Sequence, residues 1–221
     1  PEGRLNAVGD TRFDRVYQKS IEAKSRKLFA DGILDGKKVF VFGSSWEADE
    51  EVVLPAVEKL FSRDKNIVMI IAPHEPTIIH LEKLEQAFAG KISAIRFSYM
   101  NNYNGERIII IDSIGILLTL YNYADIVYVG GSFKQGVHNV LEPAVYGVPV
   151  LFGPKITNSR EALTMVDLGC GIRIQNKREA YRNLRRLFSD DSERKRLGSI
   201  SASYVGKNIG ATGRIIAQIA P

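Results

Sequence analysis

Short apolar runs rich in β-branched residues recur along almost the whole chain, and segments with helical spacing separate them. The runs cover residues 37–43, 66–72, 93–97, 107–112, 125–131, 148–154 and 171–174. Strands that are apolar throughout, rather than at every second residue, are typical of parallel sheets buried on both faces. The chain is therefore predicted to fold as α/β, a doubly wound parallel sheet with helices on both faces.

The segments between the runs space their apolar residues three and four apart, as amphipathic helices do. We expect helices over residues 14–30, 48–61, 78–88, 113–123, 139–146 and 159–168, and C-terminal helices from about residue 177. No repeat, low-complexity stretch or linker interrupts this order. Residues 1–221 are predicted to form a single domain.

Composition excludes several other classes of protein. With 45% hydrophobic and 25% charged residues, the chain is not a disordered or low-complexity sequence. Cys170 is its only cysteine, so no internal disulfide can form. No apolar run approaches the ~18 residues of a membrane span, and no signal-peptide pattern opens the chain. We expect a soluble piece and, because it starts on Pro1 rather than Met, part of a longer protein.

Positive charge is concentrated near the C-terminus. From Arg173 onward there are eleven Lys and Arg but four Asp and Glu, whereas the whole chain carries a net charge of +5. A solvated helix face would explain this, and so would contact with nucleic acid or anionic lipid. No zinc-finger spacing and no grouped aromatic residues accompany the charge, so we expect no nucleic-acid binding.

Gly43, Ser44 and Ser45 follow the first predicted strand and lead toward a helix. In open parallel sheets ligands lie beyond the carboxyl ends of the strands, where the free N–H groups of a helix N-terminus favour an anion. A capped turn without a ligand explains the same residues. No Walker loop and no G-x-G-x-x-G motif is present.

Two other strands also end in polar or small residues. His74 follows the second strand, where its ring can hydrogen-bond a phosphate or sugar oxygen or stand in an exposed turn. Ser113, Ile114 and Gly115 follow the fourth. Ser113 is predicted to cap a helix, and Gly115 would let a flat ligand approach the backbone.

Three glycines fall within seven residues after the fifth strand, at Gly130, Gly131 and Gly136. Such a loop can wrap its backbone around a ligand. Ser132 lies inside it, and Lys134 offers a mobile positive charge that suits a phosphate.

His138 and Glu142 are four residues apart, so they are predicted to share one face of the first turn of a helix. The Glu142 carboxylate can accept both hydroxyl protons of a ribose diol. Asn139 can bind a base edge or a phosphate. The alternative is that Glu142 only complements a helix N-terminus. The density of the motif favours nucleotide binding.

Neither metal binding nor hydrolysis by a serine nucleophile is indicated. His74, His80 and His138 are scattered, no D-x-D triplet occurs, and G-x-S-x-G is absent. The acidic cluster over residues 47–51 is interpreted as a solvated first turn of a helix. We expect no metal and no cofactor.

Motifs across nearly the whole chain resemble those of a known family. They are Gly9-Asp10-Thr11-Arg12-Phe13-Asp14, Gly43-Ser44-Ser45-Trp46-Glu47-Ala48-Asp49-Glu50-Glu51, Asp112-Ser113-Ile114-Gly115, Gly130-Gly131-Ser132 with His138-Asn139-x-x-Glu142, Gly153-Pro154, and Asn208-Ile209-Gly210-Ala211-Thr212. They resemble the C-terminal, Rossmann-like half of GT-B glycosyltransferases and, more narrowly, of the 3-deoxy-D-manno-octulosonic acid (Kdo) transferases.

The resemblance implies a donor-binding domain for CMP-Kdo in lipopolysaccharide biosynthesis. The acceptor, a lipid A precursor, and the catalytic base would belong to an absent N-terminal domain, at the cytoplasmic face of the bacterial inner membrane. No catalytic residue is then expected here. The basic C-terminal helices would suit an anionic membrane surface. The fragment alone is expected to bind donor nucleotide weakly and to transfer nothing.

The resemblance also implies roles for residues. Glu142 would bind ribose, and Gly131, Ser132 and Asn139 would line the nucleotide or phosphate. His74, Ser44 and Ser45 would face the donor, and residues 113–115 would flank the cytosine through their backbone.

The sequence departs from the family pattern at several places. Pro73-His74-Glu75-Pro76 stands where the family has P-R-H-P-E-R, so the family's arginines have no counterpart, and Lys134 is our candidate substitute. Ile116 replaces a Glu, and Val137 stands where a Gly is usual. The alternatives are a GT-B transferase or epimerase that uses a UDP-sugar, and a nucleotide-binding module without activity.

Overall fold

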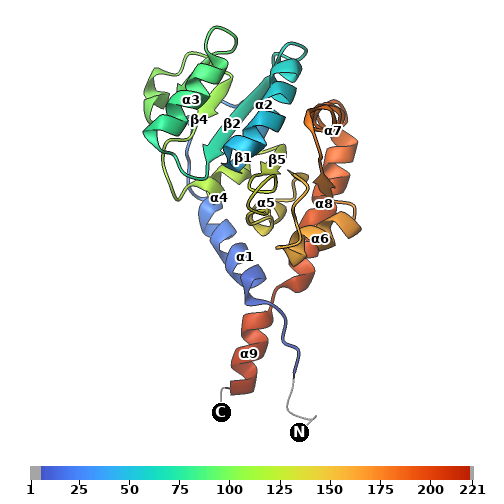
Figure 1. The fold of residues 1–221 in the computed structure, drawn as a ribbon. Helices are drawn as coiled ribbons and strands as arrows, with labels where there is room; N and C mark the ends of the chain where they lie inside the picture. The colour runs from blue at the N-terminus through green and yellow to red at the C-terminus, as the bar shows by residue number, and fades with distance from the viewer. Residues whose placement is uncertain (1–5, 220–221) are drawn as a thin grey trace.

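The computed structural model describes residues 6–219. Seven strands form one sheet in the order β3-β4-β2-β1-β5-β6-β7, and every pair of neighbours is parallel (Figure 1). The strands are β1 Lys38–Ser45, β2 Ile67–Pro73, β3 Ala94–Arg96, β4 Ile108–Ile110, β5 Ile126–Val129, β6 Val150–Phe152 and β7 Gly171–Arg173. The chain winds outward from β1 to one edge and then returns to β5 on the other side of β1, which confirms the doubly wound parallel sheet.

Helices connect the strands and cover both faces of the sheet. They are α1 Thr11–Lys24, α2 Glu47–Phe61, α3 Ile78–Phe88, α4 Leu117–Leu120, α5 Leu141–Ala144, α6 Arg160–Asp167, α7 Lys177–Ser189, α8 Asp191–Asn208 and α9 Ala211–Ile219, with 3-10 turns η2 Phe97–Asn102 and η3 Tyr121–Tyr123. The C-terminal helices begin at Lys177, where the sequence predicts them.

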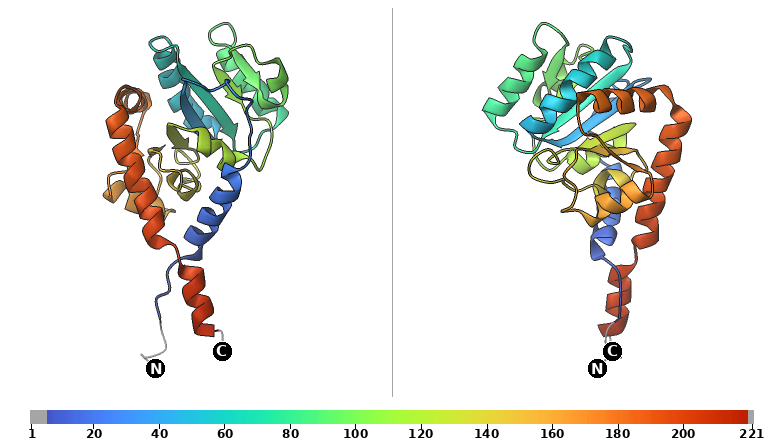
Figure 2. Two further views of the ribbon diagram at one scale, coloured as in Figure 1. Left: turned by 180° about the vertical axis from the view of Figure 1, so that it is seen from behind. Right: turned by 45° about the vertical axis from the view of Figure 1, so that its right-hand side comes forward.

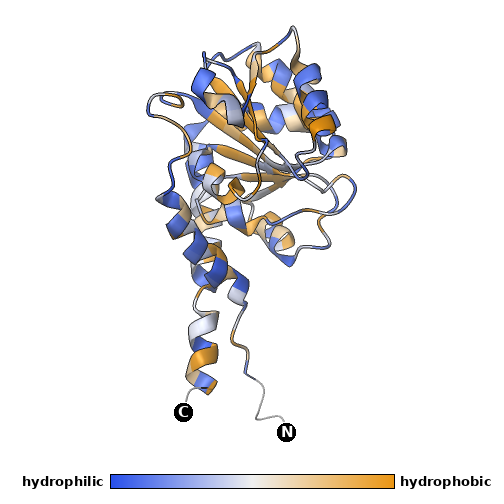
Figure 3. Ribbon diagram, turned by 90° about the vertical axis from the view of Figure 1, so that its left-hand side faces the viewer, coloured by the Kyte–Doolittle hydropathy of each residue, from blue (hydrophilic) through white to orange (hydrophobic). Residues whose placement is uncertain are grey.

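Side chains that alternate along β1 build two separate cores. Val39 and Val41 pack with α1 and α5 residues on one face, whereas Phe40 and Phe42 pack with α2, α3 and α7 residues on the other. All seven residues of β2 are buried. The apolar strands lie between helices whose outer faces are polar, as Figure 3 shows. Burial on both faces is the reason why the strands are apolar throughout.

Three of the predicted helices are wrong in extent. The helix expected over residues 14–30 is α1, which ends at Lys24. The helix expected over residues 113–123 is only α4 followed by η3, because Gly115 has a φ of 80° and Asp112 accepts hydrogen bonds from the Ser98 N–H and hydroxyl. Ser113 therefore does not cap a helix. The helix expected over residues 139–146 shrinks to the four residues of α5.

Helix α9 and the segment before α1 project together from the body of the molecule (Figure 2). Asp14 joins α9 to α1, because its carboxylate accepts hydrogen bonds from the backbone N–H of Gly210 and from the N–H and hydroxyl of Thr212. Arg214 of α9 donates from Nε to the carbonyl of Val8 in the segment before α1, at 2.9 Å. None of the helices described is both long and apolar enough to cross a membrane.

Candidate functional site

Three loops meet at the carboxyl edge of the sheet, and their backbones hold one another. The N–H of His74 donates to the carbonyl of Ser45 at 2.9 Å, and the N–H of Gly130 donates to that of Gly43 at 2.9 Å. The N–H of His138 donates in turn to Gly130 at 3.2 Å. The ends of β1, β2 and β5 thus form one surface, as the sequence predicts.

The glycines beside β1 permit close packing rather than ligand approach. A Cβ at Gly43 would lie 2.1 Å from the hydroxyl oxygen of Tyr121, and one at Gly130 would lie 2.0 Å from the carbonyl oxygen of Ser44. β1 runs on through Ser45, so Gly43 does not end the strand. Ser44, at a φ of 51°, is half-buried, whereas Ser45 is fully buried and donates to Glu50 at 2.6 Å. The Ser45 hydroxyl thus already has a partner within the protein, and its expected role toward the donor stays a prediction.

Two acids in the first turn of α2 are buried, so the prediction of a solvated turn is wrong for them. The Asp49 carboxylate accepts the Tyr128 hydroxyl at 2.8 Å and the Gly131 N–H at 2.9 Å. Burial raises the pKa of Asp49. Glu50 lies 2.9 Å from Nε2 of His80, and this hydrogen bond raises the pKa of His80. Both acids fix the loops that surround the site.

The glycine loop is held from within. Ser132 is fully buried, and its hydroxyl accepts the N–H of Gly153 at 2.5 Å, so its side chain supports the loop. Its expected place beside the nucleotide stays a prediction. Gly136 lies against Asn158, where a Cβ would meet the amide at 2.7 Å. The Asn158 amide bonds both the N–H and the carbonyl of Val137.

Three aromatic side chains lie together above this edge. The indole N–H of Trp46 donates to Nε2 of His138 at 2.9 Å, and the planes of the two rings differ by 6°. His74 stacks on both, with ring centroids 4.3 Å from His138 and 4.8 Å from Trp46. The structure thus brings His74 and His138 together.

A cavity of about 470 Å³ adjoins this cluster, between the loop after β5 and helix α1. His138, Asn139 and Glu142 line it from one side, and Arg12, Arg15 and Lys19 of α1 line it from the other. Because Arg15 and Lys19 are one helical turn apart, both can present positive charge to the same cavity.

Glu142 is half-buried beside this cavity, and burial raises its pKa. Asn139 donates to its carboxylate at 3.0 Å and accepts the Leu141 N–H at 3.1 Å. Helix α5 begins only at Leu141, so His138 and Glu142 do not share a helical face as the sequence predicts. Asn139 and Glu142 are nevertheless adjacent, and one carboxylate oxygen has no partner among the residues described.

A second cavity of about 340 Å³ lies beside the start of α2. Ser45, Trp46, His80 and Lys134 are among its lining residues. Lys134 thus stands apart from the cavity that holds Glu142. Ser113, Ile114 and Gly115 form an exposed loop that lines neither cavity, and Ile114 is 82% exposed.

The sequence did not predict that α1 and Trp46 contribute to the site. α1 lies more than a hundred residues before Glu142, and no spacing rule links them. The resemblance quoted Arg12 and Trp46 within motifs but gave neither a role. Within residues 6–219 no group of acidic, His or Cys side chains could hold a metal ion.

Comparison with known proteins shows that the chain is similar in sequence to sugar transferases. It is 32% identical to the 3-deoxy-D-manno-octulosonic acid transferase of Aquifex aeolicus over 195 residues, which are 86% of this chain and 50% of that protein. It is 30% identical to the enzyme of the same name from Rickettsia prowazekii over 187 residues, 82% of this chain and 39% of that protein. No protein-family model matches the chain.

A solved structure shows the same fold. It is the C-terminal CMP-Kdo binding domain of WaaA from Acinetobacter baumannii, with a TM-score of 0.71 and 20% identity, covering 88% of this chain and 99% of that domain. The chain spans between 31% and 52% of the length of eight curated relatives that it matches. It matches the C-terminal part of the transferases among them.

Proposed function

Because this chain matches the C-terminal part of the Kdo transferases, we propose that it is the donor-binding domain of such an enzyme and takes CMP-Kdo. The whole protein would transfer Kdo from CMP-Kdo to a lipid A precursor in lipopolysaccharide biosynthesis. The acceptor site and the catalytic base would lie in an N-terminal domain, so this chain supplies donor recognition.

The cavity beside Glu142 carries the proposal. A ribose diol offers two hydroxyl donors, and Glu142 with Asn139 offers a carboxylate acceptor and an amide at one point of the wall. CMP-Kdo also carries a phosphate and a sugar carboxylate. Arg15 and Lys19 supply two positive charges in the same cavity, and neither forms an ion pair with another residue described. They provide the cations that the segment around His74 lacks.

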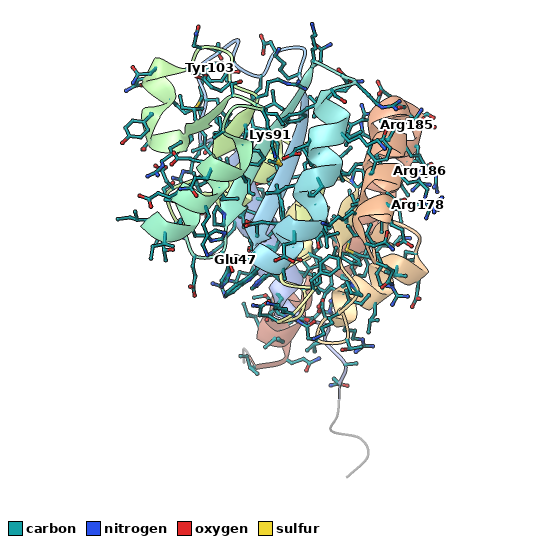
Figure 4. The ribbon with its side chains drawn as sticks, turned by 45° about the horizontal axis from the view of Figure 1, so that its top comes forward. Glu47, Lys91, Tyr103, Arg178, Arg185 and Arg186 are labelled. Carbon is teal, nitrogen blue, oxygen red and sulfur yellow. The ribbon has the colours of Figure 1, made fainter. Side chains whose placement is uncertain are left out.

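We also propose that this domain contacts an anionic inner-membrane surface, and the exposed face of α7 supports this. Arg178, Arg185 and Arg186 point away from the sheet (Figure 4). Together with Lys59 and Arg182 they border a shallow hollow of about 600 Å³. The opposite face of α7 is apolar and packs in the core. Because its apolar face is already buried in the core, α7 would bind a membrane surface through its charged side chains and would not insert into the bilayer.

A GT-B transferase or epimerase that uses a UDP-sugar is the alternative, since the fold alone serves both. The two differ in the nucleotide they bind. CMP carries one phosphate and cytosine, whereas UDP carries two phosphates and uracil.

Calorimetric titration of the chain with CMP, UMP and UDP tests the proposal. We expect CMP to bind more tightly than the other two, and Glu142→Ala to weaken CMP at least about tenfold, as loss of a charge-assisted hydrogen bond does. Glu22→Ala, which removes an exposed carboxylate of α1, is the matched control and should leave affinity unchanged.

Preference for UDP would favour the alternative, and equal CMP affinity in Glu142→Ala would remove this residue from the site. The chain alone is expected to transfer no sugar, so Kdo transfer by the isolated chain would contradict the division of labour proposed above.

A further inference from the structure

Trp46 determines which nitrogen of His138 carries the proton. An indole N–H can only donate, so the nitrogen that it contacts must act as an acceptor. The indole nitrogen of Trp46 lies 2.9 Å from Nε2 of His138 and donates to it, and the planes of the two rings are nearly parallel. A neutral His138 therefore holds its proton on Nδ1.

The surroundings keep His138 neutral. It is half-buried, and its Nε2 edge faces the glycine loop, where a Cβ at Gly131 would lie 3.0 Å from Nε2. His74 covers the ring at 4.3 Å. Burial, followed by the charge of His74, lowers the pKa of His138. No carboxylate of the described residues lies within ion-pair distance of this ring, whereas His80 has Glu50.

The other ring nitrogen of His138 has no partner within the described part of the protein. Nδ1 makes no hydrogen bond with any residue described, and His138 lines the cavity that holds Asn139 and Glu142. A donor at this place complements an anionic oxygen, and its neutrality leaves the positive charge of the cavity to α1.

We propose that Trp46 is a positioning residue that holds His138 as the neutral Nδ1–H tautomer, and that this N–H donates to the phosphate of the bound nucleotide. The second half rests on the function proposed above, whereas the first half concerns the free protein.

Nitrogen-15 NMR of the histidine rings in the ligand-free chain tests the first half. We expect the Nδ1–H form of His138 in the unaltered protein and a shift toward Nε2–H in Trp46→Phe, which keeps an aromatic ring but loses the donor. His74→Ala, which removes the stacked ring and leaves the indole bond, should retain Nδ1–H. An Nε2–H form in the unaltered chain, or no change in Trp46→Phe, would overturn the proposal.

CMP titration of the same variants tests the second half. Trp46→Phe should weaken CMP about twofold to tenfold, the range for one neutral hydrogen bond. His138→Asn places an amide near Nδ1 and should restore more affinity than His138→Gln, whose amide reaches the Nε2 position. Equal loss in both variants would overturn the contact with phosphate. Failure of the unaltered chain to bind CMP would contradict the proposed function and this contact. The tautomer of His138 is measured without ligand, so that result would not be affected.

Thermal unfolding of each variant identifies those that do not fold. If Trp46→Phe is unstable, Trp46→Leu gives a second variant without a hydrogen-bond donor, with the same two readouts.

Discussion

Asp49 and Glu50 are consecutive acids in one helical turn, yet each is buried for a separate task. Asp49 receives hydrogen bonds from Tyr128 and from the Gly131 N–H, which join α2 to β5 and to the glycine loop. Glu50 joins Ser45 to His80 of α3. A buried carboxylate is tolerated only where such donors surround it. Neither residue lines the two cavities described above, but their hydrogen bonds hold the loops that do.

The His80–Glu50 pair makes stability depend on pH. Because the hydrogen bond to Glu50 raises the pKa of His80 above 6.5, the folded chain binds this proton more tightly than the unfolded chain. The stabilisation is therefore complete below the unfolded pKa and is lost as the pH rises through the folded value. We expect His80→Gln to cost about 1–3 kcal/mol at about pH 5.5 and less at about pH 8.5.

Urea denaturation of both proteins at the two pH values measures this difference. A cost that is the same at both would contradict a role for the charged form of His80.

At the scale of elements, the backbone of α8 packs directly against the turn after α5, with no side chain between them at Gly198. A Cβ at Gly198 would lie 1.9 Å from the carbonyl oxygen of Gly147, so no larger residue fits without moving one element. Gly206 lies in the same helix with nothing within 4 Å of its would-be Cβ. The two glycines therefore differ only in what surrounds them.

This difference gives a matched pair of substitutions in α8. Gly198→Ala should destabilise the fold by about 1–3 kcal/mol, because overpacking forces the backbone apart. Gly206→Ala should stabilise it by up to about 1 kcal/mol, since alanine loses less conformational entropy than glycine in a helix. Chemical denaturation measures both, and destabilisation by Gly206→Ala would show that the helix end needs its glycine.

At the scale of the whole molecule, the basic surface of α7 should bring the chain to anionic lipid. Replacing Arg178, Arg182 and Arg185 by Gln removes three charges from that surface. At about 1 kcal/mol per charge, binding to phosphatidylglycerol vesicles should fall at least about tenfold. Arg26, Arg63 and Lys65, which are exposed elsewhere, give a control variant with the same loss of charge.

Co-sedimentation with phosphatidylglycerol and with phosphatidylcholine vesicles checks this prediction. Binding that falls equally in both variants would reflect net charge alone, and binding to neutral vesicles would contradict an electrostatic surface. Added salt should release the unaltered chain.

The sequence alone determined the doubly wound parallel sheet, since runs such as residues 67–73 are apolar throughout and only a strand covered on both faces needs that pattern. It also located the loops around His74, Asn139 and Glu142, because glycines and polar residues that follow buried strands must meet at one edge. The predicted adjacency of Asn139 and Glu142 to a ligand stays a prediction.

Only the tertiary structure decided which of these polar groups remain available. Ser45 and Ser132 are small polar residues in a motif, yet neighbours from other elements occupy their hydroxyls. Conversely, Arg15, Lys19 and Trp46 enter the site from a helix distant in sequence and from the start of α2. Local pattern records whether a residue sits on a strand, loop or helix, whereas burial and hydrogen-bond partners depend on contacts between segments far apart in the chain.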